Sequence, residues 1–321
     1  MSNRITRLLA VMLGFVLVVS ACGSDSDDAA PAATTAAPAA AEAEAEAPAT
    51  TAAPAATEAP APPEEPVNVG QVFDIGGRGD GSFNDMAYAG LEKAANELGA
   101  NISDASPNSD GSNRPELLRL MAEANDLVIG VGWLFDTAMA EVAVEYPDTN
   151  FAIIDGFVDA PNVASLLYAE HEGSFLVGAA AGMKTGANVI GFIGGVNFPL
   201  INKFEAGFAA GVAQTNPDAT VLVEYVTEPP DFDGFNAPDR GREIALSMYE
   251  KGADIIYQAA GGTGFGVFEA AKSHTEDSGS KVWAIGVDSD QYNVVDASVK
   301  EYLMTSMMTV SYTHLTLPTK S

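Results

Sequence analysis

The chain has 321 residues, enough for one large or two medium domains, and a formal net charge of −29. This charge excludes a basic nucleic-acid-binding surface, because phosphate contacts require clustered Lys and Arg, so we expect no nucleic-acid partner. One cysteine, Cys22, cannot form an intrachain disulfide, and with only three histidines a zinc site is not expected.

Residues 1–21 have the pattern of a secretory signal peptide. Arg4 and Arg7 precede the apolar run Leu8–Val19, which is followed by small residues and is short for a membrane span. The sequence Val19-Ser20-Ala21-Cys22 resembles a bacterial lipobox. That resemblance implies cleavage before Cys22 and attachment of lipid to its sulfur and new amino group. The alternative is an ordinary exported protein with an incidental cysteine.

Residues 22–66 are predicted to form a lipid-anchored, disordered linker. From Gly23 to Pro66 the chain is almost wholly Ala, Pro, Thr, Glu, Ser and Asp, without an aromatic or large aliphatic residue. Such a segment cannot bury a core, so it is expected to act as a tether between the membrane and a folded part.

From Val67 onward, short apolar runs alternate with helical patterns, which predicts parallel βαβ units. The strands are too many for one small sheet, so we expect two similar α/β halves that divide near residues 169–173. The expected strands are 67–73, 127–131, 151–154, 163–167, 189–193, 220–225, 255–258 and 281–287. The expected helices are 84–98, 114–124, 136–146, 173–184, 201–215, 238–251 and 264–274.

The turn after the first strand is the leading candidate for a binding site, because ligands of open α/β sheets lie outside the carboxyl ends of the strands. Its polar and aromatic residues are Asp74, Asp80, Phe83, Asn84 and Asp85. This set suits a neutral ligand with hydroxyl groups and a flat ring better than it suits phosphate. A purely structural explanation is that Ser82 caps the next helix, Asp85 is a favourable first-turn charge and Phe83 packs in a core.

Five later strand ends also carry polar or glycine-rich turns, at residues 130–133, 155–156, 194–198, 260–264 and 288–291. Glycine at such turns permits tight turns or close approach of a ligand to the backbone. One such turn is explained by turn chemistry alone, but five that face one crevice indicate a binding site.

Four motifs in order resemble the basic membrane protein family, the substrate-binding lipoproteins of ABC-type nucleoside importers. They are Asp80–Asp85 (DGSFND), Asn197–Phe208 (NFP…KFEAGF), Ala253–Gly264 (ADII…GGTG) and Gly286–Gln291 (GVDSDQ). The resemblance covers about residues 67–308. It implies an α/β type I periplasmic-binding-protein fold, with two Rossmann-like lobes that have parallel sheets and are joined by three crossovers at a hinge. The implied parts are lobe 1 (67–170), lobe 2 (171–287) and a return to lobe 1 (288–309).

The resemblance also implies a purine nucleoside as ligand, with its base stacked between Phe83 and Phe204. Stacking on an aromatic ring contributes about 1–3 kcal/mol per base. Phe204 and Phe208 also share one helix face, which is the usual spacing of core residues.

The remaining site residues follow from the same resemblance. Asn84 and Asp85 fall where the family contacts the base edge, and Asn84 can both donate and accept hydrogen bonds. Asp74 and Asp288 fall where it holds ribose hydroxyls, for which carboxylates are suited. Trp133 takes a position usually held by Phe or Tyr, so we expect it to form a pocket wall.

The end of the chain departs from the family pattern. The family's Lys after Thr-Ser, which reaches the ribose, has no counterpart in Thr305-Ser306-Met307-Met308. We therefore expect a truncated C-terminus that leaves lobe 1 incomplete, and we expect residues 310–321 to be a non-native tail.

The expected function is that of a substrate-binding lipoprotein on the extracytoplasmic face of the membrane, which delivers a nucleoside to an ABC permease by hinge closure. One alternative is a type I binding protein for a sugar or another small signalling ligand. An enzyme is a third alternative, but the glycines at 76, 77, 79 and 81 lack dinucleotide-binding spacing. No G-x-S-x-G, P-loop or Cys–His pair occurs, so we expect no catalytic residues, no cofactor and no metal.

Overall fold

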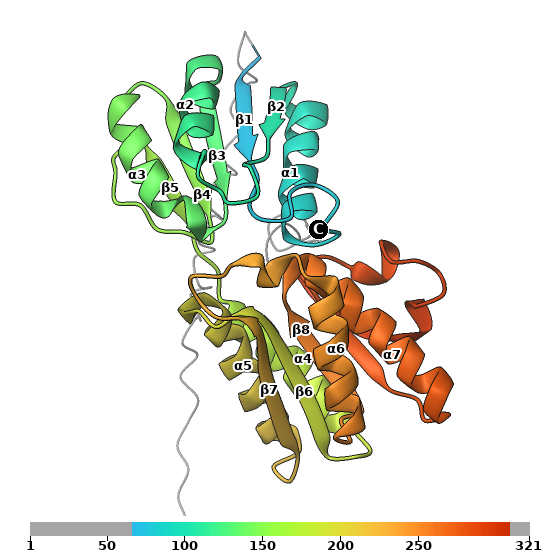
Figure 1. Cartoon of the computed structure of the whole chain (residues 1–321). Helices are drawn as coiled ribbons and strands as arrows, with labels where there is room; N and C mark the ends of the chain where they lie inside the picture. Colours follow the sequence, from blue (N-terminus) through green and yellow to red (C-terminus); the bar gives the residue numbers. More distant parts are fainter. Residues whose placement is uncertain (1–65, 309–321) are drawn as a thin grey trace, which may run out of the picture. The chain divides into compact units, whose positions relative to one another are not determined.

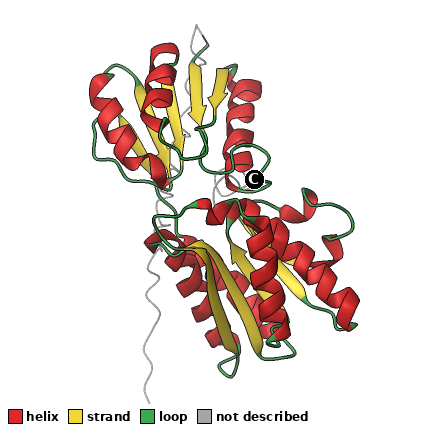
Figure 2. Cartoon of the chain, viewed as in Figure 1, coloured by secondary structure: helices red, strands yellow, loops and turns green. Residues whose placement is uncertain are grey.

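In this computed structural model the described part of the chain is residues 66–308. The predicted signal peptide, Cys22, the linker up to residue 65 and the tail 310–321 lie outside the described residues. The described chain forms two five-stranded sheets in which every pair of neighbouring strands is parallel (Figures 1 and 2). This arrangement confirms the predicted α/β class with two similar halves.

The first sheet, with its three helices, is here called lobe 1. Its strands are β1 (Asn68–Val72), β2 (Asn101–Ala105), β3 (Leu127–Val131), β4 (Asn150–Ile154) and β5 (Val163–Leu166). Helix α1 (Phe83–Leu98) covers one face, and α2 (Arg114–Ala124) and α3 (Asp136–Glu145) cover the other (Figure 1).

The second sheet, with its four helices, is here called lobe 2. Its strands are β6 (Val189–Val196), β7 (Thr220–Thr227), β8 (Ile255–Ala259), β9 (Trp283–Val287) and β10 (Leu303–Met307). One face packs against α4 (Glu170–Lys184) and α5 (Pro199–Thr215), and the other against α6 (Pro238–Glu250) and α7 (Gly264–Ser278).

The two sheets have the same strand order. Lobe 1 runs β2-β1-β3-β4-β5, and lobe 2, read in the same sense, runs β7-β6-β8-β9-β10. In each sheet the order reverses beside the first strand, so the switch points lie between β1 and β3 and between β6 and β8. A ligand is expected at the carboxyl ends of these strands.

Strand β6 illustrates why the sheets are buried on both faces. Ile190 and Phe192 point into the core under α4 and α5, whereas Ile193 belongs to the core under α6 and α7. All three side chains have no exposed surface. A continuous apolar run is therefore required, as expected for parallel strands covered by helices on both sides.

The prediction that residues 288–309 return to lobe 1 is wrong. Strand β10 pairs in parallel with β9, so this segment extends the sheet of lobe 2. Val295, Val299 and Tyr302 are buried in the core under α6 and α7 and fix the segment there. Within residues 66–308 the chain therefore passes from one sheet to the other once, between β5 and α4.

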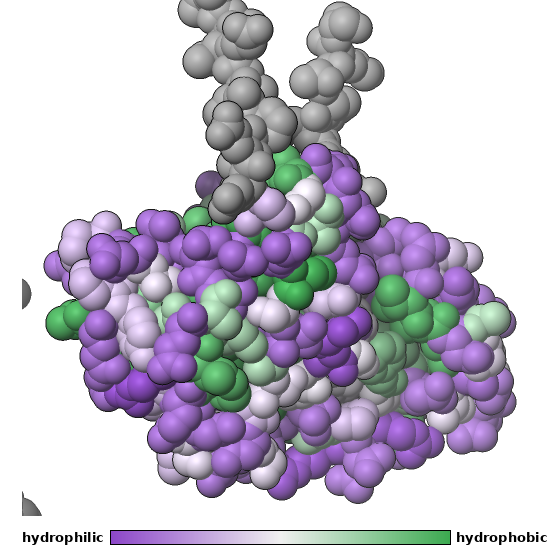
Figure 3. Space-filling model, turned by 90° about the horizontal axis from the view of Figure 1, so that it is seen from above, coloured by the Kyte–Doolittle hydropathy of each residue, from purple (hydrophilic) through white to green (hydrophobic). Residues whose placement is uncertain are grey.

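On the face that Figure 3 shows, polar residues predominate and the hydrophobic residues form small separate patches. Leu98, Val144 and Leu176 are more than two-thirds exposed, and they lie on three different helices. Isolated exposed apolar side chains of this kind are normal for a folded domain.

Helices α4 and α5 pack with their backbones in close approach. A Cβ atom added to Gly211 of α5 would lie 2.0 Å from the carbonyl oxygen of Phe175 in α4, and one added to Gly207 would lie 2.2 Å from that of His171. Because the neighbouring atoms belong to the backbone, a side-chain rotation cannot relieve the overlap.

We expect Gly211→Ala to lower the free energy of unfolding by about 1–3 kcal/mol, the usual cost of overpacking a core. Gly90→Ala in α1 is the matched control, since a Cβ at Gly90 meets nothing within 4 Å. That control should raise the free energy of unfolding by about 0.4–1 kcal/mol. Urea denaturation of both variants measures the difference, and equal effects would contradict the assigned helix packing.

Candidate functional site

A pocket lies at the carboxyl ends of strands from both lobes. Lobe 1 contributes residues that follow β1, β3 and β4, and lobe 2 contributes residues near the ends of β6, β7, β8 and β9. The lining residues are Asp74, Ile75, Asp80, Phe83, Asn84, Gly132, Trp133, Asp155, Leu200, Ile201, Phe204, Phe235, Ala259, Gly261, Val287 and Asp288.

The structure brings six of the seven predicted ligand-binding residues to this pocket: Asp74, Phe83, Asn84, Trp133, Phe204 and Asp288. Asp85 is the exception. Its carboxylate accepts hydrogen bonds from the backbone N–H groups of Gly79 (2.7 Å) and Gly81 (2.8 Å), so it shapes the loop and does not line the pocket.

Asp80, and not Ser82, caps helix α1. The Asp80 carboxylate accepts hydrogen bonds from the backbone N–H groups of Ser82 (2.9 Å), Asn84 (2.9 Å) and Asp85 (3.1 Å). Burial raises the pKa of Asp80, and these N–H donors oppose that rise. The Ser82 hydroxyl makes no capping bond and instead reaches lobe 2.

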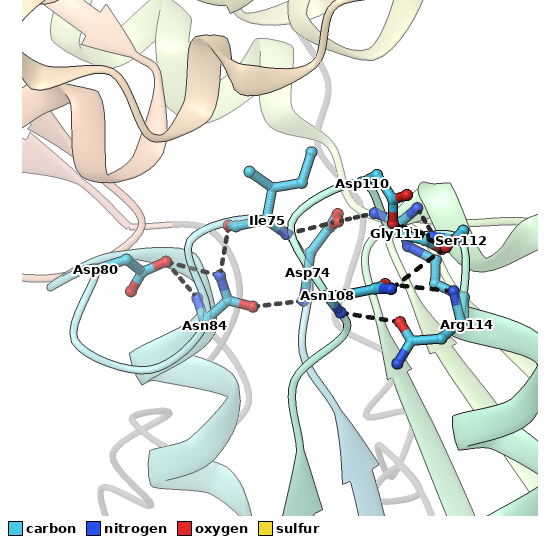
Figure 4. Close-up of polar contacts among 10 residues, drawn as sticks. Asp74, Ile75, Asp80, Asn84, Asn108, Asp110, Gly111, Ser112 and Arg114 are labelled. Atoms are coloured by element: carbon cyan, nitrogen blue, oxygen red, sulfur yellow. Dashed lines mark hydrogen bonds and ion pairs between the residues drawn. The ribbon is translucent and has the colours of Figure 1, made fainter.

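Asn84 joins this loop to the end of β1 (Figure 4). Its Oδ1 accepts from the backbone N–H of Asp74 (2.8 Å), and its Nδ2 donates to the carbonyl of Ile75 (3.2 Å) and to Asp80 Oδ2 (3.0 Å). Both Nδ2 hydrogens are therefore donated within the chain. What Asn84 offers toward the pocket is the remaining acceptor capacity of Oδ1.

Asp74 is held at the pocket edge by Arg114 of α2. Oδ1 of Asp74 lies 3.4 Å from Nη2 of Arg114 and accepts the backbone N–H of Ile75 at 2.8 Å. A Cβ at Gly132 would lie 2.1 Å from Asp74 Oδ2, so only glycine allows the carboxylate this close to the β3 turn. Burial raises the pKa of Asp74 to about 6, although Arg114 opposes the rise.

The two predicted stacking rings come from different lobes. Phe83 begins α1 and packs partly against the core of lobe 1, and Phe204 lies in α5. Phe204 is only 4% exposed and belongs to the core under α4 and α5. It therefore combines the core role expected from its spacing with Phe208 and a place in the pocket lining.

Three charged residues near the pocket were not identified from the sequence as a group. Asp155 follows β4 and lines the pocket, and Glu170 starts α4 and pairs with Lys203 of α5 (3.2 Å). Asp155 Oδ1 and Glu170 Oε1 are buried without a hydrogen-bond partner among the described residues. Burial, then the nearby Glu170 and Asp288, raise the pKa of Asp155 well above its usual range.

The lobes are joined beside the pocket by hydrogen bonds between the loop that precedes α1 (residues 74–82, here called the α1 loop) and the turn after β9. Ser82 Oγ donates to Asp288 Oδ2 (2.7 Å), and the carbonyl of Gly81 accepts from Ser289 Oγ (2.8 Å) and Gln291 Nε2 (3.3 Å). Both parts of this contact belong to sequence motifs that were predicted to form the site.

A second, more polar hollow shares Asp74 and Ile75 with the pocket. It is lined by three arginines, Arg78, Arg114 and Arg240, but each is paired with a carboxylate of Asp104, Asp74 or Asp231. Within residues 66–308 no group of three or more Asp, Glu, His or Cys side chains could hold a metal ion. No helix in that range has the length and apolar character needed to cross a membrane.

Comparison with known proteins agrees with this architecture. Residues 67–317 match the family model described as ABC transporter substrate-binding protein, PnrA-like. The chain belongs to this family. The match ends inside the predicted tail 310–321, whose origin stays a prediction. The resemblance to the basic membrane protein family is thereby confirmed.

Two curated proteins illustrate how similar this PnrA-like chain is to its relatives. It is 40% identical over 234 residues to the CD4+ T-cell-stimulating antigen of Listeria monocytogenes, a match that covers 70% of this chain and 63% of the relative. It is 35% identical over 227 residues to the ABC transporter nucleoside-binding protein BmpA of Lactococcus lactis, covering 68% and 63%. The chain thus spans just under two-thirds of the length of these relatives.

A solved ABC transporter solute-binding protein from Aeropyrum pernix matches with a TM-score of 0.64 and 31% identity, covering 74% of this chain and 69% of that one. Together with the two parallel sheets, this likeness confirms the predicted periplasmic-binding-protein fold class.

Asp74 is expected to make stability depend on pH. Because its pKa rises from 3.8 to about 6 on folding, the native state binds the proton more tightly, and the free energy of unfolding falls as the pH rises from 4 to 6. The size of this contribution is about 3 kcal/mol. Urea denaturation of the parent and Asp74→Asn across this range should show the parent losing stability relative to the variant, and a constant difference would contradict the assignment.

Gly81→Ala is expected to oppose closure of the lobes. A Cβ at Gly81 would lie 2.5 Å from the ring of Phe265 in lobe 2, and the residue has φ of +55°. Gly79→Ala is the control, with φ of +96° but nothing within 4 Å of the added Cβ. Small-angle X-ray scattering should show a larger radius of gyration for Gly81→Ala only, since opening of the lobes expands the protein; equal radii in both variants would contradict this contact.

Proposed function

We propose that this chain binds a purine nucleoside between its two lobes and delivers it to an ABC permease. The observation that carries the proposal is that Phe83 of lobe 1 and Phe204 of lobe 2 line one pocket. A flat base between two rings gains stacking from each, about 1–3 kcal/mol per ring. Since the rings belong to different lobes, both contacts require the lobes to be closed.

The polar groups of the pocket suit a ligand that donates hydrogen bonds. Asp74, Asp155 and Asp288 all line it, and Asp155 Oδ1 has no partner among the described residues. Carboxylates accept two hydrogen bonds each and match a sugar diol. Asp155, with its raised pKa, can also donate from a protonated carboxyl to an acceptor on a base edge. The carboxylates of Asp74 and Asp288 disfavour a phosphate, so a nucleoside fits better than a nucleotide.

Membership of a family of ABC substrate-binding proteins supports transport without catalysis. In this proposal the predicted lipid on Cys22 and the linker 22–66 hold the binding domain at the extracytoplasmic face of the membrane, near the permease. BmpA of Lactococcus lactis is named a nucleoside-binding protein, which favours the same ligand class here.

The proposal is tested by calorimetric titration of the full chain with inosine, adenosine, guanosine, cytidine, ribose and galactose. Phe83→Leu and Phe204→Leu keep apolar bulk but remove one stacking ring each. We expect each variant to weaken purine-nucleoside binding about 5- to 150-fold. Phe157→Leu, at an exposed ring outside the pocket, is the matched control and should bind as the parent does.

The ligand panel separates the alternatives. A response to galactose or ribose with none to nucleosides would keep the fold and replace the nucleoside proposal by the sugar alternative. Asn84 variants are less informative, because Asn84 supports Asp74, Ile75 and Asp80 whatever the ligand is.

A further inference from the structure

Trp133 forms a three-ring stack that crosses between the lobes. The centroid of its ring lies 3.9 Å from that of Phe198, with an interplanar angle of 6°. The ring of Phe232 packs edge-on against Trp133, with a centroid distance of 5.3 Å and an interplanar angle of 79°. Trp133 follows β3 in lobe 1, whereas Phe198 precedes α5 and Phe232 follows β7 in lobe 2.

The three rings stand in different relations to the pocket. Trp133 is one of the lining residues, but neither Phe198 nor Phe232 is. The two phenylalanines therefore contact the tryptophan without lining the pocket themselves. All three are only partly buried, so the stack is not part of either lobe's core.

We propose that Phe198 and Phe232 are positioning residues that hold Trp133 as a wall of the binding pocket when the lobes are closed. The inference rests on the proposed function for its ligand, but the stack itself is independent of which ligand binds. Because its members come from both lobes, opening the lobes must separate the rings. The stack thus resists ligand release on its side of the pocket, as Ser82–Asp288 and the contacts to Gly81 do at the α1 loop.

The consequence is kinetic. A contact that is made in the closed form and is absent from the open form slows dissociation, and it leaves the encounter of ligand with the open protein unchanged. The preference of an aromatic pair for its stacked or edge-on geometry corresponds to about a 2- to 12-fold change in an equilibrium constant. We expect this factor to be found in the dissociation rate.

The first experiment is stopped-flow binding of inosine to the full chain. Phe198→Ala and Phe232→Ala should each raise the dissociation rate about 2- to 12-fold with the association rate within about twofold of the parent. Phe198→Tyr should restore slow dissociation, since it keeps the stacking ring. Phe157→Ala is the control and should leave both rates unchanged. Thermal melting verifies that each variant is folded.

A double-mutant cycle separates positioning from an independent effect. If Phe198 acts through Trp133, adding Phe198→Ala to Trp133→Ala should change the dissociation rate little further. Additive effects of the two substitutions would overturn the inference.

A readout that needs no ligand makes failure of this inference distinguishable from failure of the proposed function. The chain has two tryptophans, so Trp283→Phe leaves Trp133 as the single emitter. In that background Phe198→Ala should increase acrylamide quenching of Trp133, with or without inosine, and Phe157→Ala should not. Unchanged quenching would contradict the stacking of Phe198 on Trp133 and overturn the inference. Increased quenching in a protein that binds no nucleoside would support the stacking of Phe198 on Trp133 and would refute the proposal that the ligand is a nucleoside.

Discussion

Parallel pairing places the carboxyl ends of all strands of a sheet along one edge, and the rest of this structure depends on that constraint. Asp74, Trp133 and Asp155 follow three different strands of lobe 1, yet all line one pocket. Asp288 follows β9 of lobe 2 and lines the same pocket. The covering helices bury both faces of each sheet, so the polar residues that follow the strands are confined to this edge.

The polar edge carries an electrostatic cost that the chain offsets only in part. Arg114 reaches Asp74, Lys203 reaches Glu170, and backbone N–H groups satisfy Asp80. Asp155 Oδ1 accepts no hydrogen bond among the described residues, and the nearby Lys203 opposes the rise in its pKa only in part. Burial raises the pKa of the Asp155 carboxyl and disfavours its charged form. A shift of this kind is characteristic of binding sites rather than of stable cores.

The sequence predicted the fold class and most elements well, because buried parallel strands such as Leu127–Val131 are continuous apolar runs. It missed β2 and β10, whose sequences NISDA and LMTSM contain polar residues. Within residues 66–308 both are edge strands, each paired on one side, so they lack the apolar signal of a central strand. Missing β10 is also why residues 288–309 were assigned to the wrong lobe.

Site residues were predicted by position better than by role. The six that line the pocket stand at strand ends or in motifs that could be read directly. Asp85 and Asn84 look like ligand contacts in the sequence, but their hydrogen bonds go largely to the loop. Asp155 followed a predicted strand and could have been found there. Its relation to Glu170 and Lys203 depends on how α4 and α5 pack, which periodicity does not reveal.

The shared strand order has an evolutionary consequence. Each half of the domain repeats one topological unit, so the turn after β1 corresponds to the turn after β6, and that after β3 to that after β8. At these equivalent places one half carries Asp74 and Trp133, and the other carries Phe198 and Gly261. The strand order is the same in both halves, but the side chains at the equivalent turns differ. Ligand preference can therefore diverge through substitutions in a few turns, with both sheets left intact.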